Sequence, residues 1–164
     1  MNYLKSLLVL TLFLAVSGCA SKFRTYDGPE VTRIALFKSV RTMQLLNGDN
    51  VLKEYKFDLG FAPVGDKQVE GDGKTPEGRY IIDRRNPDSS FHLSIGISYP
   101  NADDIAEAEA LGESPGGDIF IHGQYNTFTK RGPDWTAGCI SVTNREIEEI
   151  YAMVRNGTVI DLYP

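Results

Sequence analysis

Short β-branched or apolar runs, the third of which alternates loosely with polar residues, follow one another after residue 30, and this pattern is typical of β-strands. Val31–Lys38, Arg41–Leu46 and Val51–Leu59 are three such runs. Asn47–Asn50, between the second run and the third, has the residues of a hairpin turn. The chain after residue 30 is therefore predicted to open as a β-meander.

The middle of the chain combines a long loop, two strands and a short helix. Gly, Pro and Asp dominate Gly60–Gly78, which predicts a loop. Strands are predicted at Arg79–Asp83 and Phe91–Tyr99. Asn101 is then a suitable N-cap for a helix that runs to about Leu111.

The strongest helix signal lies near the C-terminus. Thr143 and Glu146 have the spacing of a capping box. Apolar residues then recur at helical spacing at Ile147, Ile150, Tyr151 and Val154. Asn156-Gly157 is expected to end this helix, and Thr158–Tyr163 to form a closing strand. Residues 31–164 are therefore predicted to be one mainly β domain with one or two helices, of the α+β class.

The first 18 residues have the pattern of an export signal. Lys5 precedes an apolar run from Leu7 to Val16, and the small residues Ser17 and Gly18 follow. This run is too short to span a bilayer as a mature helix. We therefore predict that residues 1–18 are removed and that the protein is exported.

Residues 14–19, Leu-Ala-Val-Ser-Gly-Cys, resemble a bacterial lipobox. The resemblance implies cleavage before Cys19, acylation of this cysteine and, because Ala20 follows, delivery to the outer membrane. Several acyl chains together give stable anchoring. Residues 19–30 are thus predicted to be a lipidated cysteine and a flexible tether, and the domain is expected to be periplasmic and membrane-anchored.

Charge and cysteine content narrow the function. The 164 residues carry a formal net charge of −5, which does not suit nucleic-acid binding, because that depends on Lys and Arg neutralising phosphates. If Cys19 is acylated, Cys139 is the one remaining thiol, in an oxidising compartment. Cys139 is then either a buried inert thiol or a functional one.

The surroundings of Cys139 favour a nucleophile. A thiol that attacks an acyl carbon needs a base, and His122 is expected at the end of the apolar strand Asp118–Ile121. It also needs N–H groups directed at the oxyanion, which the peptides of Ala137, Gly138 and Cys139 are placed to supply. The sequence therefore predicts a Cys–His catalytic pair.

Four segments stand out around this pair: GDGKTPEGRYIID from residue 71, Ile-His-Gly at 121–123, TAGCISVTNREIEEIY from residue 136, and VRNGTVIDLYP at the C-terminus. The last three resemble the L,D-transpeptidase catalytic domain, or YkuD, family, and the first is similar to the strand-entry motif of that family. The resemblance covers the chain from about Val31 onward. It implies a YkuD-like β-sandwich that acts on peptidoglycan stem peptides without a cofactor. Cys139 would form a thioester at an L-centre that precedes a D-residue and pass the acyl group to an amine.

The same resemblance assigns roles around the pair. His122 is expected to be the base, Gly123 to orient the imidazole through its carbonyl, and Thr136 to flank the site. Ala137 and Ser141 stand where the family often has His and Arg, and that Arg is thought to hold the substrate.

Three residues of the loop before Cys139 have two interpretations each. Lys130 and Arg131 either supply the missing positive charge or form a solvated loop tip. Trp135 either shapes one wall of the site or serves packing alone.

The sequence is consistent with three functions. The first is an L,D-transpeptidase. The second is a hydrolase that uses the same thioester, with water as acceptor, to trim stem peptides or release wall-attached proteins. The third is a lipid-anchored wall-binding module with a decayed site. No metal is expected, because the chain has two His and lacks a His-Glu-x-x-His motif, and His92 is interpreted as structural.

Overall fold

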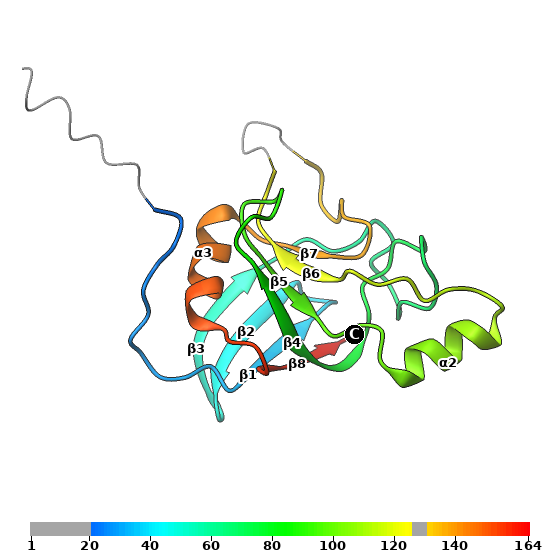
Figure 1. Ribbon diagram of the computed structural model, residues 1–164, viewed down its shortest axis with the longest axis horizontal. Coiled ribbons are helices and arrows are strands. Elements are labelled where there is room, and N and C mark those ends of the chain that lie inside the picture. The colour runs from blue at the N-terminus through cyan, green and yellow to red at the C-terminus, as the bar shows by residue number, and fades with distance from the viewer. Residues whose placement is uncertain (1–20, 126–130) are drawn as a thin grey trace, which may run out of the picture.

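Eight strands form one curled sheet in the computed structural model, which describes residues 21–125 and 131–164 (Figure 1). The strand order is β3-β2-β1-β8-β4-β5-β6-β7. The strands are β1 (Arg33–Phe37), β2 (Thr42–Asn47), β3 (Asn50–Lys56), β4 (Gly78–Asn86), β5 (Ser94–Ile97), β6 (Phe120–His122), β7 (Ile140–Ser141) and β8 (Val159–Tyr163). The helices are α2 (Ala102–Ala110) and α3 (Asn144–Met153). The predicted signal segment, Cys19 and Lys130 lie outside the described residues.

The sheet curls until its two ends meet. β1 pairs with β8 in parallel, whereas β2 and β3 continue from it as the predicted antiparallel meander. Just after β3, Asp58 exchanges two backbone hydrogen bonds of 2.9 Å with Ser141 of β7 at the opposite end of the sheet. The mainly β fold with two helices is confirmed, and the strands form a continuous sheet that packs on itself.

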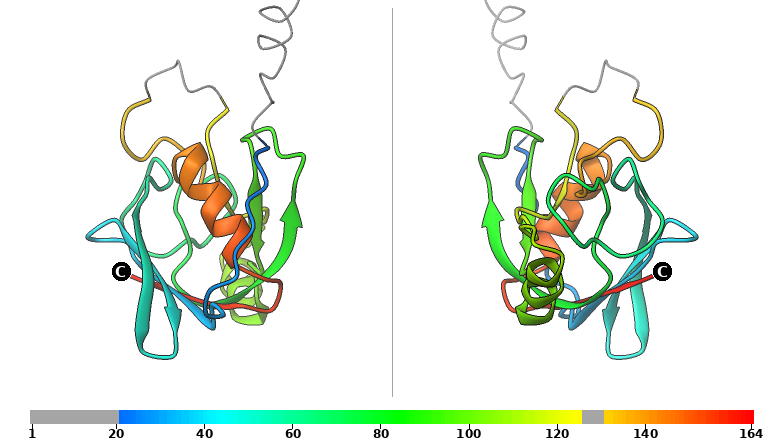
Figure 2. Two further views of the ribbon diagram at one scale, coloured as in Figure 1. Left: turned by 90° about the vertical axis from the view of Figure 1, so that its left-hand side faces the viewer. Right: turned by 90° about the vertical axis from the view of Figure 1, so that its right-hand side faces the viewer.

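Helix α3 lies between the β1–β3 half of the sheet and the β4–β5 hairpin (Figure 2). Its predicted capping box is confirmed, because Thr143 Oγ1 accepts the Glu146 N–H and the Glu146 carboxylate accepts the Thr143 N–H. The apolar face is buried at Ile147, Ile150 and Met153. Burial of this face, more than helix propensity, fixes the element in place.

The C-terminal end of α3 differs from the prediction. The helix stops at Met153, three residues before Asn156, and Val154 is an extended C-cap. Arg85 of β4 explains this end, because its guanidinium donates to the carbonyl oxygens of Tyr151 (2.5 Å) and Val154. A cation that binds the last carbonyls both satisfies them and complements the negative end of the helix.

Two strand boundaries also differ from the prediction. β4 extends to Asn86, past the predicted end at Asp83, and β5 begins only at Ser94. His92 has φ +73°, which a strand does not allow, so residues 87–93 form a turn between the two strands. This turn forms one wall of a cavity at the end of the sheet.

Helix α2 lies at one end of the molecule, away from the sheet's interior (Figure 1). Asn101 caps it as predicted, through a capping box with Asp104. Within residues 21–125 and 131–164, no helix has the length and apolar character needed to cross a membrane.

Candidate active site

The imidazole of His122 is held at the end of β6 and is only 4% exposed. Its Nδ1 lies 2.6 Å from the carbonyl oxygen of Gly123, so Nδ1 carries the hydrogen and donates it. Nε2 of the neutral ring is therefore left with its lone pair. Gly123 is required here, because a Cβ atom would lie 2.6 Å from Asn144 Oδ1 and 2.9 Å from the Phe91 carbonyl oxygen.

Two aromatic rings enclose this imidazole. Phe91 lies 4.5 Å from it between ring centroids and Trp135 lies 5.8 Å away, nearly perpendicular. Burial lowers the pKa of His122, and the Arg131 cation lowers it further, whereas the hydrogen bond to Gly123 opposes the shift. At neutral pH the ring is consequently uncharged and able to accept a proton.

A tight turn precedes Cys139. Thr136 Oγ1 accepts the Gly138 N–H at 3.2 Å and donates to the Cys139 carbonyl oxygen at 2.6 Å. Gly138 has φ +135°, and a Cβ atom there would lie 2.7 Å from the Lys74 carbonyl oxygen, so only glycine suits the position. The fully buried Thr75 donates to the Gly138 carbonyl oxygen at 2.8 Å, which ties the turn to the 60–78 loop.

The Cys139 thiol is partly exposed and points to the start of β6. Sγ lies 3.4 Å from the carbonyl oxygen of Asp118, to which the thiol donates. Within the described chain, no hydrogen bond joins Cys139 to His122. Burial raises the pKa of the thiol and the Asp118 carboxylate adds to the increase, while the Phe120 N–H opposes both. The thiol is thus protonated in this arrangement and needs a base to become a nucleophile.

Cys139 lies where two cavities meet. One has a volume of about 300 Å³ and also contains His122 and Phe91; its other lining residues are Asn86, Ser89, Ser90, Ser94, Asp118 and Phe120. The second has a volume of about 310 Å³ and is lined by Lys67, Glu70, Gly71, Gly116, Gly117, Asp118, Ile119, Ala137 and Cys139. A thiol with space on both sides can contact one molecule in each cavity.

The structure brings most of the predicted site residues together. Ala137 lines the second cavity, and Trp135 packs on His122 with the Arg131 guanidinium 4.0 Å from its ring. Ser141 is only 1% exposed, and its Oγ has no hydrogen-bond partner among the described residues. His92 lies outside the cavity lining and binds Glu148 at 2.9 Å, as a structural residue would.

Sequence reasoning missed three contributors, namely Phe91, Asp118 and Thr75. Thr75 lies inside the GDGKTPEG segment, whose resemblance to the family was a signal that its residues have a fixed role. Asp118 acts through its backbone carbonyl, which no side-chain pattern reveals. The described residues contain no cluster of three or more His, Cys, Asp or Glu side chains arranged to bind a metal ion.

The chain matches the model of a known catalytic domain and is similar to a curated protein named for the same activity. The profile of the YkuD L,D-transpeptidase catalytic domain matches residues 32–162. YafK of Escherichia coli K12, which is named as a candidate L,D-transpeptidase, is 32% identical over 144 residues, covering 80% of this chain and 53% of YafK. The chain thus spans about half the length of the curated relatives it matches.

Solved structures have the same fold. Pgp2 of Campylobacter jejuni, a helical cell shape determining protein, superposes with a TM-score of 0.65 at 25% identity, over 93% of this chain and 54% of Pgp2. An L,D-transpeptidase of Mycobacterium smegmatis has a TM-score of 0.54 at 12% identity, over 82% of this chain and 59% of its own.

Proposed function

Because the chain belongs to the YkuD family of L,D-transpeptidase catalytic domains, we propose that it is a cysteine acyltransferase acting on peptidoglycan stem peptides. The observation that supports this most directly is that Cys139 and His122 line the same cavity, while Nδ1 of His122 is bound to the Gly123 carbonyl and Nε2 keeps its lone pair. A neutral imidazole and a protonated thiol in one cavity are the two reactants of a thiolate-forming step.

In the first half-reaction, the thiol turns from the Asp118 carbonyl toward His122 and gives its proton to Nε2. The thiolate of Cys139 attacks the carbonyl carbon of the L-centre, and a tetrahedral oxyanion forms. Collapse of this intermediate breaks the C–N bond to the D-residue, whose nitrogen takes the proton back from the His122 imidazolium. The D-amino acid leaves, and an acyl thioester remains.

The oxyanion needs N–H donors beside the nucleophile. We assign this role to Ala137 and Cys139, because the N–H of Gly138 is already bonded to Thr136. The contribution of Gly138 is then its left-handed backbone, which lets the chain turn between the two donors.

In the second half-reaction, an amine attacks the thioester, releases its proton to His122 and frees the thiolate. The second cavity supports an amine acceptor, since the carboxylate residue Glu70 lines it and attracts an ammonium group. Asp118 lines it as well, but its carboxylate is paired with Arg84 at 3.2 Å. Lys67 also lines it, but its Nζ is bound to Asp72 at 3.0 Å.

Hydrolysis of the same thioester is the second candidate. Ala137 and Ser141 replace larger family residues, and the cavity of about 310 Å³ beside Cys139 admits water as readily as an amine. The product would be a trimmed stem peptide or a protein released from the wall.

Product analysis decides between these functions. The full-length protein is incubated with tetrapeptide-bearing sacculi and a labelled D-amino acid, and the muropeptides are analysed by mass spectrometry. Exchange of the terminal D-residue or new crosslinks indicate acyl transfer, whereas shortened stems alone indicate hydrolysis. Unchanged stems with both wild type and Cys139→Ser would refute both and favour a wall-binding module.

We extend the proposal to the cell envelope. A peptidoglycan substrate requires a periplasmic location, and the lipobox-like segment ending at Cys19 supports a lipid anchor at the outer membrane. By analogy with Pgp2, altered crosslinking would change cell shape. Metabolic labelling with a fatty-acid analogue is expected to mark the wild type but not Cys19→Ala; an unlabelled wild type would contradict the anchor.

A further inference from the structure

The residues expected to be a flexible tether make specific contacts in the structure. Residues 21–30 run between α3 and the β4–β5 hairpin (Figure 2). We call residues 22–26 the N-terminal strap and residues 87–93, which connect β4 to β5, the pocket turn. The strap contacts the pocket turn and α3 through different side chains.

Lys22 binds two backbone carbonyls of the pocket turn. Its Nζ donates to the carbonyl oxygen of Pro87 at 2.6 Å and to that of His92 at 3.1 Å. One half-buried ammonium therefore joins the first and sixth residues of this turn. Hydrogen bonds from a charged donor are stronger than neutral ones, so this contact restricts how far the turn can open.

Arg24 fixes the strap to α3. Its Nε and Nη2 donate to one oxygen of Glu148 at 3.0 and 2.7 Å, and the other oxygen of Glu148 is 2.9 Å from His92 Nε2. Glu148 thus joins the strap and the pocket turn through its two oxygens. Phe23 adds an aromatic contact with Tyr151, with ring centroids 6.2 Å apart.

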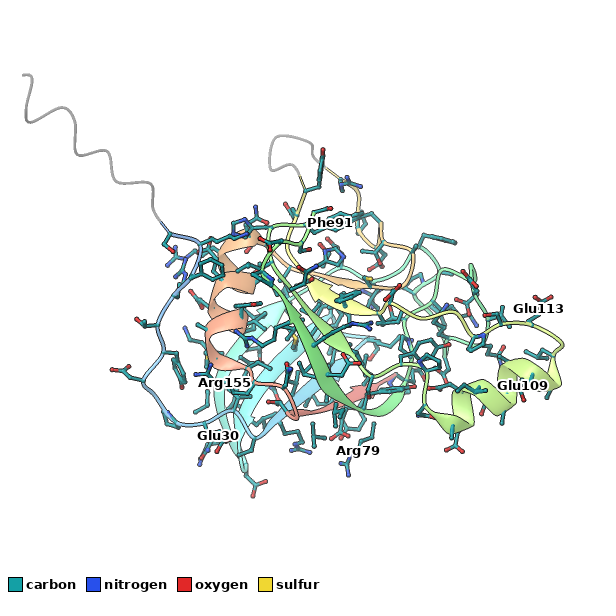
Figure 3. All side chains as sticks on the ribbon, viewed as in Figure 1. Glu30, Arg79, Phe91, Glu109, Glu113 and Arg155 are labelled. Atoms are coloured by element: carbon teal, nitrogen blue, oxygen red, sulfur yellow. The ribbon has the colours of Figure 1, made fainter. Side chains whose placement is uncertain are left out.

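Residues of the pocket turn lie beside Cys139 and His122. Ser89, Ser90 and Phe91 line the cavity that contains Cys139 and His122. Phe91 projects at the tip of the β4–β5 hairpin (Figure 3), and its ring lies 4.5 Å from the imidazole. The position of this turn therefore decides how much water reaches His122.

We infer that the N-terminal strap is a working part of the site, and that Lys22 and Arg24 are positioning residues that keep Phe91 packed on His122. The inference rests on the proposed role of His122 as the base. Of the two residues, Lys22 is expected to matter more. The Arg24 side chain is 37% exposed, so solvent screens its ion pair, whereas Lys22 is partly buried against two carbonyls.

The test uses full-length protein with Lys22→Ala, Arg24→Ala and the conservative Lys22→Arg. Arg79→Ala is the matched control, because Arg79 also makes a two-bond ion pair, with Asp161 at 2.7 and 3.1 Å, but at the opposite end of β4 from Phe91 (Figure 3). Amide hydrogen exchange of residues 87–93 and an NMR pH titration of His122 are measured for each variant.

Lys22→Ala is expected to speed exchange in the pocket turn by about threefold to tenfold, with a smaller effect from Arg24→Ala. Water reaching the ring then reverses part of the burial effect, so the pKa of His122 rises toward its ordinary value. Lys22→Arg restores both readouts, and Arg79→Ala resembles wild type. Equal exchange and equal His122 titration in Lys22→Ala and Arg79→Ala would overturn the inference.

Hydrogen exchange and the His122 titration need no substrate, so their outcome does not depend on whether the proposed acyltransferase activity is correct. If Cys139→Ser leaves wall products unchanged while the Lys22 variants shift the His122 titration, the acyltransferase proposal fails and the strap contact stands. If Cys139→Ser abolishes product while Lys22→Ala changes neither readout, the acyltransferase proposal stands and the inferred role of the strap fails.

Discussion

Asp134 is expected to be a large contributor to stability among the loop residues near the site. It receives a bidentate ion pair from Arg41, with Nε–Oδ1 at 3.0 Å and Nη2–Oδ2 at 2.5 Å, and its Oδ1 also accepts the Leu59 N–H at 2.9 Å. Its backbone is left-handed, with φ +51°. One residue therefore joins the loop before Cys139 to the β1–β2 turn and to the segment after β3.

The cost of Asp134→Ala has two parts. A left-handed conformation costs an alanine about 1–2 kcal/mol. Loss of the acceptor for the Leu59 N–H and the Arg41 guanidinium costs roughly 1–3 kcal/mol, at the lower end because the Arg41 side chain is 30% exposed. We expect a total of about 2–4 kcal/mol in the free energy of unfolding. Asp134→Asn keeps an oxygen and tolerates the backbone, so it should cost only about 1 kcal/mol.

Urea unfolding measures both variants through the single tryptophan of the chain, Trp135, which adjoins the substitution. Asp134→Gly is the control for the backbone part, because glycine removes the left-handed penalty while lacking the carboxylate. Equal destabilisation by Ala and Asn, or a loss below about 0.5 kcal/mol for Ala, would refute the reasoning.

The contacts of Asp134 also predict that the stability of the fold depends on pH. Burial alone would raise the pKa of Asp134, but hydrogen bonds from Arg41 and Leu59 outweigh it and lower the folded-state pKa. The carboxylate therefore stabilises the fold fully at pH values above its ordinary pKa of 3.8. This stabilisation is lost as the pH falls through the lower pKa of the folded state. The stability difference between wild type and Asp134→Asn should shrink over that acidic range.

Three further substitutions test the site and its support. Gly138→Ala places a Cβ 2.7 Å from the Lys74 carbonyl at a positive φ, so iodoacetamide labelling of the neighbouring thiol should change at least several-fold; an unchanged rate would contradict the turn geometry. Arg131→Gln removes a cation that lowers the pKa of His122, so the NMR titration of the imidazole should move to higher pH, and no movement would contradict that coupling. Ile147→Ala removes a fully buried side chain of α3 and should cost about 2–5 kcal/mol by urea unfolding, against less than about 1 kcal/mol if the helix were loosely packed.

Local signals predicted the helices well and their ends less well. The capping box at Thr143 and Glu146 is contained within four residues, so sequence alone locates the start of α3. The end of α3 depends on Arg85, nearly 70 residues earlier in the chain, which binds its last carbonyls. Such a contact exists only after the sheet has formed, and no sequence window contains it.

In the candidate active site too, some residues could be predicted from local sequence and others could not. Cys139 and His122 carry side-chain chemistry and follow recognisable motifs, which made them predictable. Asp118 contributes a carbonyl oxygen, and Phe91 reaches the imidazole through an irregular turn. The contacts of Lys22 could not be predicted either, because a polar segment that precedes a domain has the composition of a tether whether or not it docks.

Release of the terminal D-amino acid from a purified tetrapeptide muropeptide tests the central claim most directly. The full-length wild type, Cys139→Ser and His122→Gln are compared by quantifying that amino acid and by intact-mass analysis of acid-quenched enzyme. The account predicts release by wild type, an acyl adduct on Cys139, and loss of both in Cys139→Ser, with at least about a hundredfold decrease in rate for His122→Gln. Release at the same rate by wild type and Cys139→Ser, or by neither, would contradict it.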